Sequence, residues 1–491
     1  MRFSIKLGNK AVLLLWSIAG MASGCRSDAP VEARETIPRL VSAAVLPNPH
    51  NVLSAVVTFT AEHAESARVV YQDERLALDS TPFFELTGLT DTVVILGLRP
   101  AAGYKLVVEV DNAEGGISSD TLQHTAGALP EALGRVSIAA SGIGSGLSLT
   151  SVAVPGAGVF ALAFDSSGVI RWYRHFQGEE RFPGELKRQA NGNFTLYRGS
   201  STGVEKVPGH YVEFTPAGDS VRALTVTPPR YLDNHDLWIT TGPDGQERFH
   251  FFTYDHRIAD LRPIGGGAEV SLAGHQLVRL RSDGSTEFEW NAWDHLEIEE
   301  WIEPPHPTAD AATVRDFDHP NSLTFDLDGH YIVSFRQLGQ IMKIDAMTGE
   351  IIWRLGGLRS DFTFSNDPLG GFSAQHSPGI LPNGNLLLYD NGARHQPPES
   401  RAVEYALDVV NRTATLVWEF RHTPPIYTLA VGSAQRLQDG NTLIGYGWVG
   451  YAAEVGADQN VKWSVTLSVD GQATVFYRMI RIPSLYGLRT P

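Results

Sequence analysis

The sequence has one cysteine, a deficit of basic residues and no long apolar run after its first 24 residues. A single cysteine excludes an internal disulfide. Lysine and arginine total 39 against 55 aspartates and glutamates, giving a formal net charge of −16. Because nucleic-acid binding needs a basic surface to neutralise phosphates, nucleic acid is excluded as the expected partner. The lack of a later apolar run excludes a transmembrane helix there.

The first 24 residues have the features of a signal peptide. Basic residues precede an apolar stretch at 11–21, which is too short to span a bilayer. The small residues 22–24 then lead to Cys25, as in a lipobox. The sequence predicts a lipoprotein signal peptide at 1–24 and lipidation of Cys25. The alternative is ordinary cleavage near Gly24, which leaves Cys25 as a free thiol.

A polar segment at 25–37 follows and reads as a tether. Arg26, rather than an aspartate, comes directly after the cysteine, which favours an anchor in the outer membrane. We therefore expect a periplasmic or cell-surface lipoprotein that touches the membrane only through its lipid. Its mature charge is more negative still, because the signal peptide removes three basic residues.

Residues 38–125 are predicted to form a small fibronectin- or Ig-like β-sandwich. Segments 55–59, 67–71 and 104–110 are rich in β-branched and aromatic residues. About 90 residues suit that architecture. Such modules are usually spacers, so no chemistry is assigned to this one.

After a linker at 125–133, a repeat governs the chain. Its first part is an Asx-Gly turn followed by an apolar strand, with turn glycines 53, 84, 55 and 56 residues apart: Gly192, Gly245, Gly329, Gly384 and Gly440. The long interval predicts an insertion at about 260–307, which could form a lid over the site. Its Trp293, Trp301 and the acidic run 297–300 could then affect the choice of substrate.

The second part of the repeat is a strand that ends in tryptophan: Trp172, Trp290, Trp353, Trp418 and Trp463. A sixth unit at 214–226 has the pattern without the tryptophan. Together these parts describe the four-stranded blade of a β-propeller, in which the tryptophans pack between blades.

The chain ends supply one further blade. Segments 147–154, 159–164 and 169–173 give three strands without an inner one, and 474–482 gives one strand without partners. Combined, they close the ring and remove its free edges. The prediction is an all-β protein, with the sandwich followed by a six-bladed propeller over 134–491. Seven blades are the main alternative.

Three consecutive blades carry a histidine where the inner strand begins, at His235, His319 and His376. Inner strands line the central channel, so we expect these side chains to face one pocket. The other thirteen histidines lack this shared register and are treated as surface or supporting residues. Arg336 ends the strand that follows His319, and Asn391 occupies the matching place in the next blade.

The propeller region resembles the bacterial arylsulfotransferases, which do not use phosphoadenosine phosphosulfate. The resemblance spans roughly 130–490. It rests on the segments Asp-His-Pro-Asn-Ser at 318–322, Gln-His-Ser-Pro at 375–378, the strand 331–336 and the run 383–392.

This resemblance implies transfer of a sulfuryl group from a phenolic sulfate to a phenol by a ping-pong mechanism, without a cofactor. His376 matches the family nucleophile, which forms a transient sulfohistidine. His235, His319, Asn321 and Arg336 match residues that hold the sulfate and neutralise charge. The family also implies a possible homodimer, with the N-terminal module as a candidate interface.

The chemistry fits these residue types. Sulfuryl transfer, like phosphoryl transfer, has a loose transition state that needs positioned donors and cations. A neutral imidazole is a good nucleophile near pH 7. Asn391 and a late hydroxyl residue complete the expected substrate site. Ser433 is our choice for that hydroxyl, and Thr428 competes with it.

Three other interpretations compete with this one, although the sequence shows neither the calcium site nor the eight blades that the second of them needs. The propeller could be a non-catalytic scaffold or binding lipoprotein of the cell envelope. A quinone-dependent dehydrogenase would need a calcium site of carboxylates and usually eight blades. Three histidines could also bind zinc, but Arg336 beside them favours an anion, so no metal is predicted.

Overall fold

The computed structural model describes most of the chain after the predicted signal peptide, namely residues 37–178, 183–199, 209–227, 230–302 and 314–487. Cys25 and the tether up to residue 36 lie outside these ranges. Among the described residues the structure is strands and short 3₁₀ turns, and no helix there is long and apolar enough to cross a membrane.

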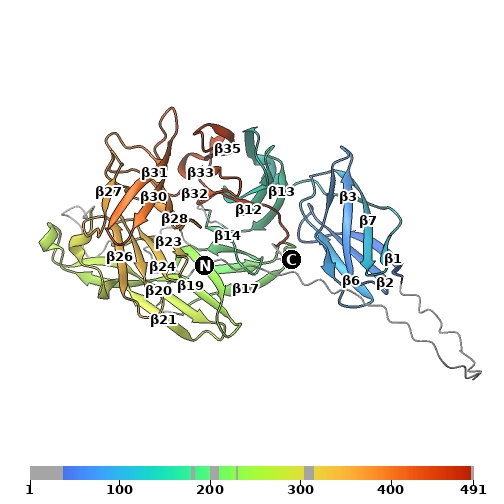
Figure 1. The fold of residues 1–491 in the computed structure, drawn as a ribbon, viewed down its shortest axis with the longest axis horizontal. Helices are drawn as coiled ribbons and strands as arrows, with labels where there is room; N and C mark the ends of the chain where they lie inside the picture. Colours follow the sequence, from blue (N-terminus) through green and yellow to red (C-terminus); the bar gives the residue numbers. More distant parts are fainter. Residues whose placement is uncertain (1–36, 179–182, 200–208, 228–229, 303–313, 488–491) are drawn as a thin grey trace, which may run out of the picture.

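The N-terminal part is a two-sheet β-sandwich (Figure 1). One sheet contains β1 (Arg39–Pro47), β2 (Ala55–Glu62) and β6 (Thr90–Ile95). The other contains β3 (Ser66–Asp73), β4 (Leu78–Ser80), β5 (Phe84–Glu85), β7 (Gly103–Asn112), β8 (Gly115–Ser118) and β9 (Leu122–Thr125). A single cluster of buried apolar side chains fills the space between the sheets. The three predicted strand segments are confirmed.

Six further sheets make up the propeller (Figure 1). The first sheet contains β37 (Ile480–Ile482), β11 (Leu147–Val154), β12 (Gly158–Asp165) and β13 (Ile170–Phe176). The second contains β14 (Leu186–Arg188), β15 (Phe194–Arg198), β16 (His210–Phe214) and β17 (Ser220–Leu224). The third contains β18 (Leu232–Thr241), β19 (Glu247–Ala259), β20 (Val270–Arg281), β21 (Thr286–Asn291) and β22 (Arg315–Asp316).

The other three sheets repeat the same order from the channel outward. The fourth contains β23 (Pro320–Phe325), β24 (Tyr331–Phe335), β25 (Gln340–Ile344) and β26 (Ile351–Gly356). The fifth contains β28 (His376–Ile380), β29 (Leu386–Asp390), β30 (Arg401–Asp408), β31 (Thr413–Arg421) and β27 (Thr363–Ser365). The sixth contains β32 (Ser433–Arg436), β33 (Thr442–Tyr446), β34 (Tyr451–Val455) and β35 (Val461–Val469), with β36 (Gln472–Ala473) and β10 (Val136–Gly142) both paired to β35.

Contacts between neighbouring sheets close these six into a ring. Strands β11 and β14, β15 and β18, β18 and β23, β23 and β28, β28 and β32, and β32 and β37 lie together in turn. As predicted, the last strand, β37, pairs with β11 in the first sheet. Two details differ. Only 480–482 of the expected strand 474–482 is extended, and β10, which the sequence did not suggest, pairs with β35.

The tryptophans pack between blades, as predicted. Trp172 on β13 is fully buried against Phe194 and Phe214 of the next sheet. Trp463 on β35 is fully buried, and its indole N–H donates to the carbonyl oxygen of Ser166 at 2.7 Å. Each indole therefore joins one blade to another.

The interpretation of 260–307 as an insertion is wrong in part. Residues 270–281 and 286–291 are strands β20 and β21 of the third blade, because β19 and β20 form a long hairpin. Trp293 and Trp301 both pack on Phe317. Buried Glu300 accepts from Arg354 at 2.6 Å. These side chains stabilise the blade, so the structure gives no support to a lid made from them.

Trp463→Ala tests how much the seam between the last and first blades contributes. The change removes a buried indole and its hydrogen bond, so we expect the free energy of unfolding to fall by about 3–5 kcal/mol in urea titrations. Trp448→Ala is the control, because Trp448 is 44% exposed, and it should change that free energy by less than about 0.5 kcal/mol. An equal loss of unfolding free energy in the two variants would contradict the stabilising role of Trp463 between the last and first blades.

Candidate functional site

The three predicted histidines come together at one end of the channel. His235 lies on β18, His319 immediately precedes β23, and His376 begins β28. The ring centroids of His235 and His319 are 4.6 Å apart. The ring of Tyr477 lies 5.9 Å from His235 and 6.5 Å from His376. The register of the repeat therefore brings the three imidazoles together, two of them beside Tyr477, which sequence reasoning had not singled out.

His376 is buried and held in one tautomer. Its Nδ1 faces two acceptors, the carbonyl oxygen of Ala374 at 3.0 Å and Oδ1 of Asn391 at 2.7 Å, so Nδ1 carries the proton. Nε2 keeps its lone pair and accepts from the backbone N–H of Val431 at 3.2 Å. Burial, followed by the positive charge of Arg336, holds the pKa of His376 well below its usual range. The ring is a neutral base at pH 7.

Asn391 is fixed by the segment that follows β31. Its amide donates to the carbonyl oxygens of Thr428 and Val431, each at 3.0 Å, and to Thr428 Oγ1 at 3.2 Å. Of the two candidate hydroxyls, Thr428 is therefore the one that contacts this part of the site. Ser433 instead donates to the carbonyl oxygen of Met479 at 3.1 Å and is not brought to the histidines.

A carboxylate contacts the Nδ1 atom of each of the other two histidines. Nδ1 of His235 lies 2.9 Å from both oxygens of Asp233, and Nδ1 of His319 bonds to Asp316. Burial opposes ionisation of Asp233, but His235 and His275 outweigh it and hold the pKa of Asp233 well below its usual value. The Asp-x-His and Asp-x-x-His spacings were visible in the sequence but were not recognised as pairs.

His275 lies behind the three histidines and bridges two carboxylates, those of Asp233 and Asp318. Its Nδ1 lies 2.5 Å from Asp318, and its Nε2 lies 3.6 Å from Asp233. Burial alone would lower the pKa of His275, but the two carboxylates raise it to about 10. The sequence analysis grouped His275 with the surface or supporting histidines and did not find its partners, because it lies in the segment that was interpreted as an insertion.

His275 also belongs to a group that could hold a metal ion, with Asp316 and Asp318. Their ligand atoms lie within 4.8 Å of one another. In the described structure, however, His275 and Asp318 are joined by a hydrogen bond. An imidazolium flanked by carboxylates itself supplies the positive charge that this group needs.

The site also holds a cation and an amide with unused hydrogen-bonding capacity. Among the described residues Arg336 has no carboxylate within 4.0 Å, and its Nε is buried without a partner. Its Nη2 donates to the carbonyl oxygen of Leu429 at 3.1 Å. Asn321 is fully buried, and its side chain donates to the carbonyl oxygen of Gln375 at 2.8 Å while its Oδ1 has no partner there. A half-buried cation without a carboxylate partner among these residues favours an anionic ligand.

Several residues of the histidine site have strained backbone conformations. His319, Ala374, Ser377 and Val431 all adopt positive φ angles, between 48° and 57°. This left-handed region is unfavourable for residues with side chains, above all for β-branched Val431. Such strain costs on the order of 1–3 kcal/mol at each position and persists only where surrounding contacts enforce it.

The pKa of His275 predicts how stability depends on pH. Because its folded pKa of about 10 exceeds the unfolded value near 6.5, the stabilisation is complete below about pH 6.5 and is lost as pH rises towards 10. His275→Gln should flatten the fall in unfolding free energy over that window, by on the order of a few kcal/mol. Urea titrations from pH 6 to about 10 measure it. The same slope in His275→Gln as in wild type, or an equal effect of exposed His50→Gln, would contradict the charge assignment.

Comparisons with known proteins identify the family of this chain. A family model described as Arylsulfotransferase (ASST) matches residues 145–478. Among solved structures, a Bacteroides caccae protein of unknown function is 14% identical, with a TM-score of 0.40 over 69% of this chain and 100% of that chain. Virginiamycin B lyase from Staphylococcus aureus is 12% identical, with a TM-score of 0.33 over 67% of this chain and 88% of that chain.

No curated protein compared with the chain matches it. The structural likenesses are too distant to carry an argument about function. The family match is different, because it covers more than half of the chain and includes the three histidines, Arg336 and Asn391. The chain belongs to the arylsulfotransferase family.

Proposed function

We propose that this protein is an aryl-sulfate sulfotransferase that moves a sulfuryl group from a phenolic sulfate ester to a phenol through a sulfohistidine. The observation that carries the proposal is the protonation state and fixed tautomer of His376. Its buried imidazole is neutral, with Nδ1–H held by Asn391, beside Arg336, which has no carboxylate partner among the described residues. Family membership supports aryl sulfotransferase activity in general.

In the first half-reaction, Nε2 of His376 attacks sulfur. The N–S bond forms as the bond from sulfur to the aryl oxygen breaks, and the electron pair leaves with the phenol oxygen. The contact from Val431 N–H to Nε2 is at the long end of the hydrogen-bond range, so its displacement costs little. The ring then carries positive charge, which Asn391 Oδ1 stabilises through Nδ1–H.

We assign the proton for the leaving phenol to His235. Asp233 stays ionised behind its Nδ1, as the acid does in a catalytic triad, and orients the ring. In the second half-reaction the acceptor phenol returns a proton to His235 while its oxygen attacks sulfur. The N–S bond breaks, and its electron pair returns to His376.

Arg336 and Asn321 are assigned to the sulfuryl group. The free donors of Arg336 suit the three peripheral oxygens, where charge is spread in a loose transition state. His319 stays neutral, because burial lowers its pKa further than Asp316 raises it. Its ring and that of Tyr477 give the aryl group an aromatic wall.

We also propose that Cys25 is lipidated and that the tether 25–37 places the propeller at the outer membrane, in the periplasm or on the cell surface. This proposal rests on the small residues before Cys25 and on Arg26 after it. It is independent of the catalytic assignment.

Incubation with 4-nitrophenyl sulfate and phenol tests the reaction. Wild type should release nitrophenol and form phenyl sulfate, and His376→Ala should reduce this rate by roughly 10³-fold or more. Arg336→Met should reduce kcat by about 10²–10³-fold, since it removes a transition-state donor. A folded wild-type protein without activity on any aryl sulfate would favour a scaffold.

Two hydroxyl variants separate Thr428 from Ser433. Thr428→Val removes a hydrogen bond to Asn391, so kcat should fall about threefold to tenfold. Ser433→Ala should leave kcat near the wild-type value, because its partner is the backbone of Met479. Steady-state kinetics of both variants decide the matter. The reverse order would contradict the role of Thr428 in holding Asn391.

A further inference from the structure

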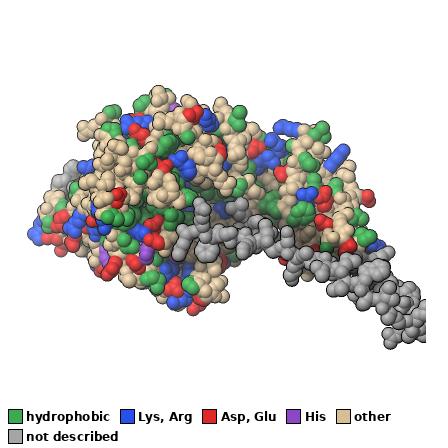
Figure 2. Space-filling view, in the orientation of Figure 1, with side chains coloured by type: hydrophobic (Ala, Val, Ile, Leu, Met, Phe, Trp, Pro, Cys, Tyr) green, Lys and Arg blue, Asp and Glu red, His purple; other side chains and the backbone are tan. Residues whose placement is uncertain are grey.

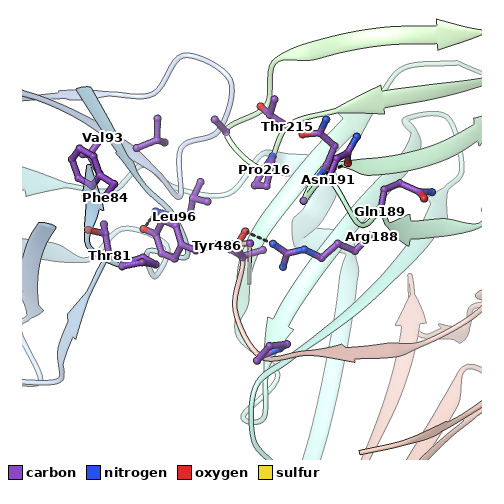
Figure 3. A pocket seen from close by; sticks show the side chains of 18 of the residues that line it. Thr81, Phe84, Val93, Leu96, Arg188, Gln189, Asn191, Thr215, Pro216 and Tyr486 are labelled. Atoms are coloured by element: carbon purple, nitrogen blue, oxygen red, sulfur yellow. Dashed lines mark hydrogen bonds between the residues drawn. The ribbon is translucent and has the colours of Figure 1, made fainter. Parts of the chain in front are cut away.

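A large cavity lies between the sandwich and the propeller, outside the histidine site. Its volume is about 790 Å³, within the range that holds drug-sized ligands. Figure 3 shows its walls: Phe84 and Leu96 on the sandwich side, Gln189 and Asn191 on the propeller side, and Tyr486 between them. Three separate parts of the chain thus build one pocket.

The two parts of the molecule are fixed against each other around this cavity. The hydroxyl of Tyr486 accepts from the backbone N–H of Leu96 at 2.8 Å, and Arg171 Nε donates to the carbonyl oxygen of Gly97 at 2.7 Å. Leu96 is buried in the same apolar cluster as Trp172 of the propeller. The pocket is therefore formed before any ligand binds.

The lining combines apolar walls with a few polar groups. Aromatic rings come from Phe83, Phe84, Trp238 and Tyr486, while amides and hydroxyls come from other lining residues. Among the described lining residues Arg188 is the one side chain that carries a charge near neutral pH. On the face in Figure 2, by contrast, acidic and basic side chains are interspersed.

Arg188 has no counter-ion among the described residues, since no carboxylate oxygen there lies within 4.0 Å of it. Its Nη1 and Nη2 each donate to a backbone carbonyl oxygen, of Ser484 and Leu485 respectively, the latter at 3.2 Å. Those two bonds leave three of its five N–H groups for another acceptor. Partial burial lowers the pKa of this guanidinium, so a bound anion would be favourable.

We propose that this cavity binds a small aromatic monoanion, with its ring between Phe84 and Tyr486 and its anionic group on Arg188. The site is distinct from the histidine cluster, because neither the three histidines nor Arg336 is among the residues that line the cavity. Trp238, which does line it, lies on β18 three residues after His235 and packs 4.1 Å from Nζ of Lys187.

Fluorescence titration with anilinonaphthalene sulfonate tests the proposal on the full chain. This probe is an aromatic monoanion whose sulfur–carbon bond cannot act as a sulfuryl donor, and phenylnaphthylamine is its uncharged counterpart. Arg188→Gln should weaken the sulfonate by about tenfold, the loss of one charge-assisted hydrogen bond, and leave phenylnaphthylamine within about twofold. Thr92→Trp, at an exposed lining position, should weaken both probes.

Arg336→Gln is the matched control, because it removes one positive charge from the histidine site instead. It should leave sulfonate binding unchanged while lowering transferase activity, so the two proposals fail separately. Binding that Arg336→Gln abolishes, or that both Arg188→Gln and Thr92→Trp leave intact, would overturn the cavity proposal. Deletion of residues 488–491, which follow the lining residue Gly487, should not alter affinity. Tighter binding after deletion would show that the chain end is the occupant.

Discussion

The hydrogen bond between Nδ1–H of His376 and Oδ1 of Asn391 is the interaction on which the site depends. It fixes the tautomer, and therefore leaves the lone pair on Nε2. Asn391 can hold this orientation because backbone carbonyls of Thr428 and Val431 fix its own amide. Burial and Arg336 then keep the ring neutral. A surface histidine would have neither the fixed tautomer nor the low pKa.

Charge around the channel is divided between two layers. Facing the pocket are three imidazoles, a buried amide and the guanidinium of Arg336, which has no carboxylate partner in the described part of the chain. Behind them, Asp233, Asp316 and Asp318 surround the imidazolium of His275. The rear layer orients His235 and His319 through their Nδ1 atoms, while no carboxylate oxygen of the described residues lies within 4.0 Å of Arg336. This separation suits the negatively charged substrate proposed for this acidic protein.

Much of the architecture could be predicted because the repeat is local in sequence. Asx-Gly turns and tryptophan strands mark the blades, and equal register places His235, His319 and His376 around one channel. The chain-closing strand followed from the strands left without partners. The long β19–β20 hairpin was mistaken for an insertion, because a longer strand pair and an inserted loop give the same spacing between turns.

The supporting residues could not be predicted, because they meet only in three dimensions. His275 lies on β20 and contacts Asp233 and Asp318, which are 42 and 43 residues away in the sequence. Tyr477 enters the channel from a segment expected to be a regular strand. The choice between Thr428 and Ser433 depended on side-chain direction, which strand patterns do not determine over an irregular segment.

Rapid-quench mass spectrometry tests the central claim most directly. Wild-type protein is mixed with excess 4-nitrophenyl sulfate without an acceptor and quenched in base, and the peptides are analysed. The account predicts a burst of nitrophenol equal to the number of chains and one sulfuryl group, on His376. A sulfuryl group on His235 or His319, or turnover without any burst or labelled peptide, would contradict it.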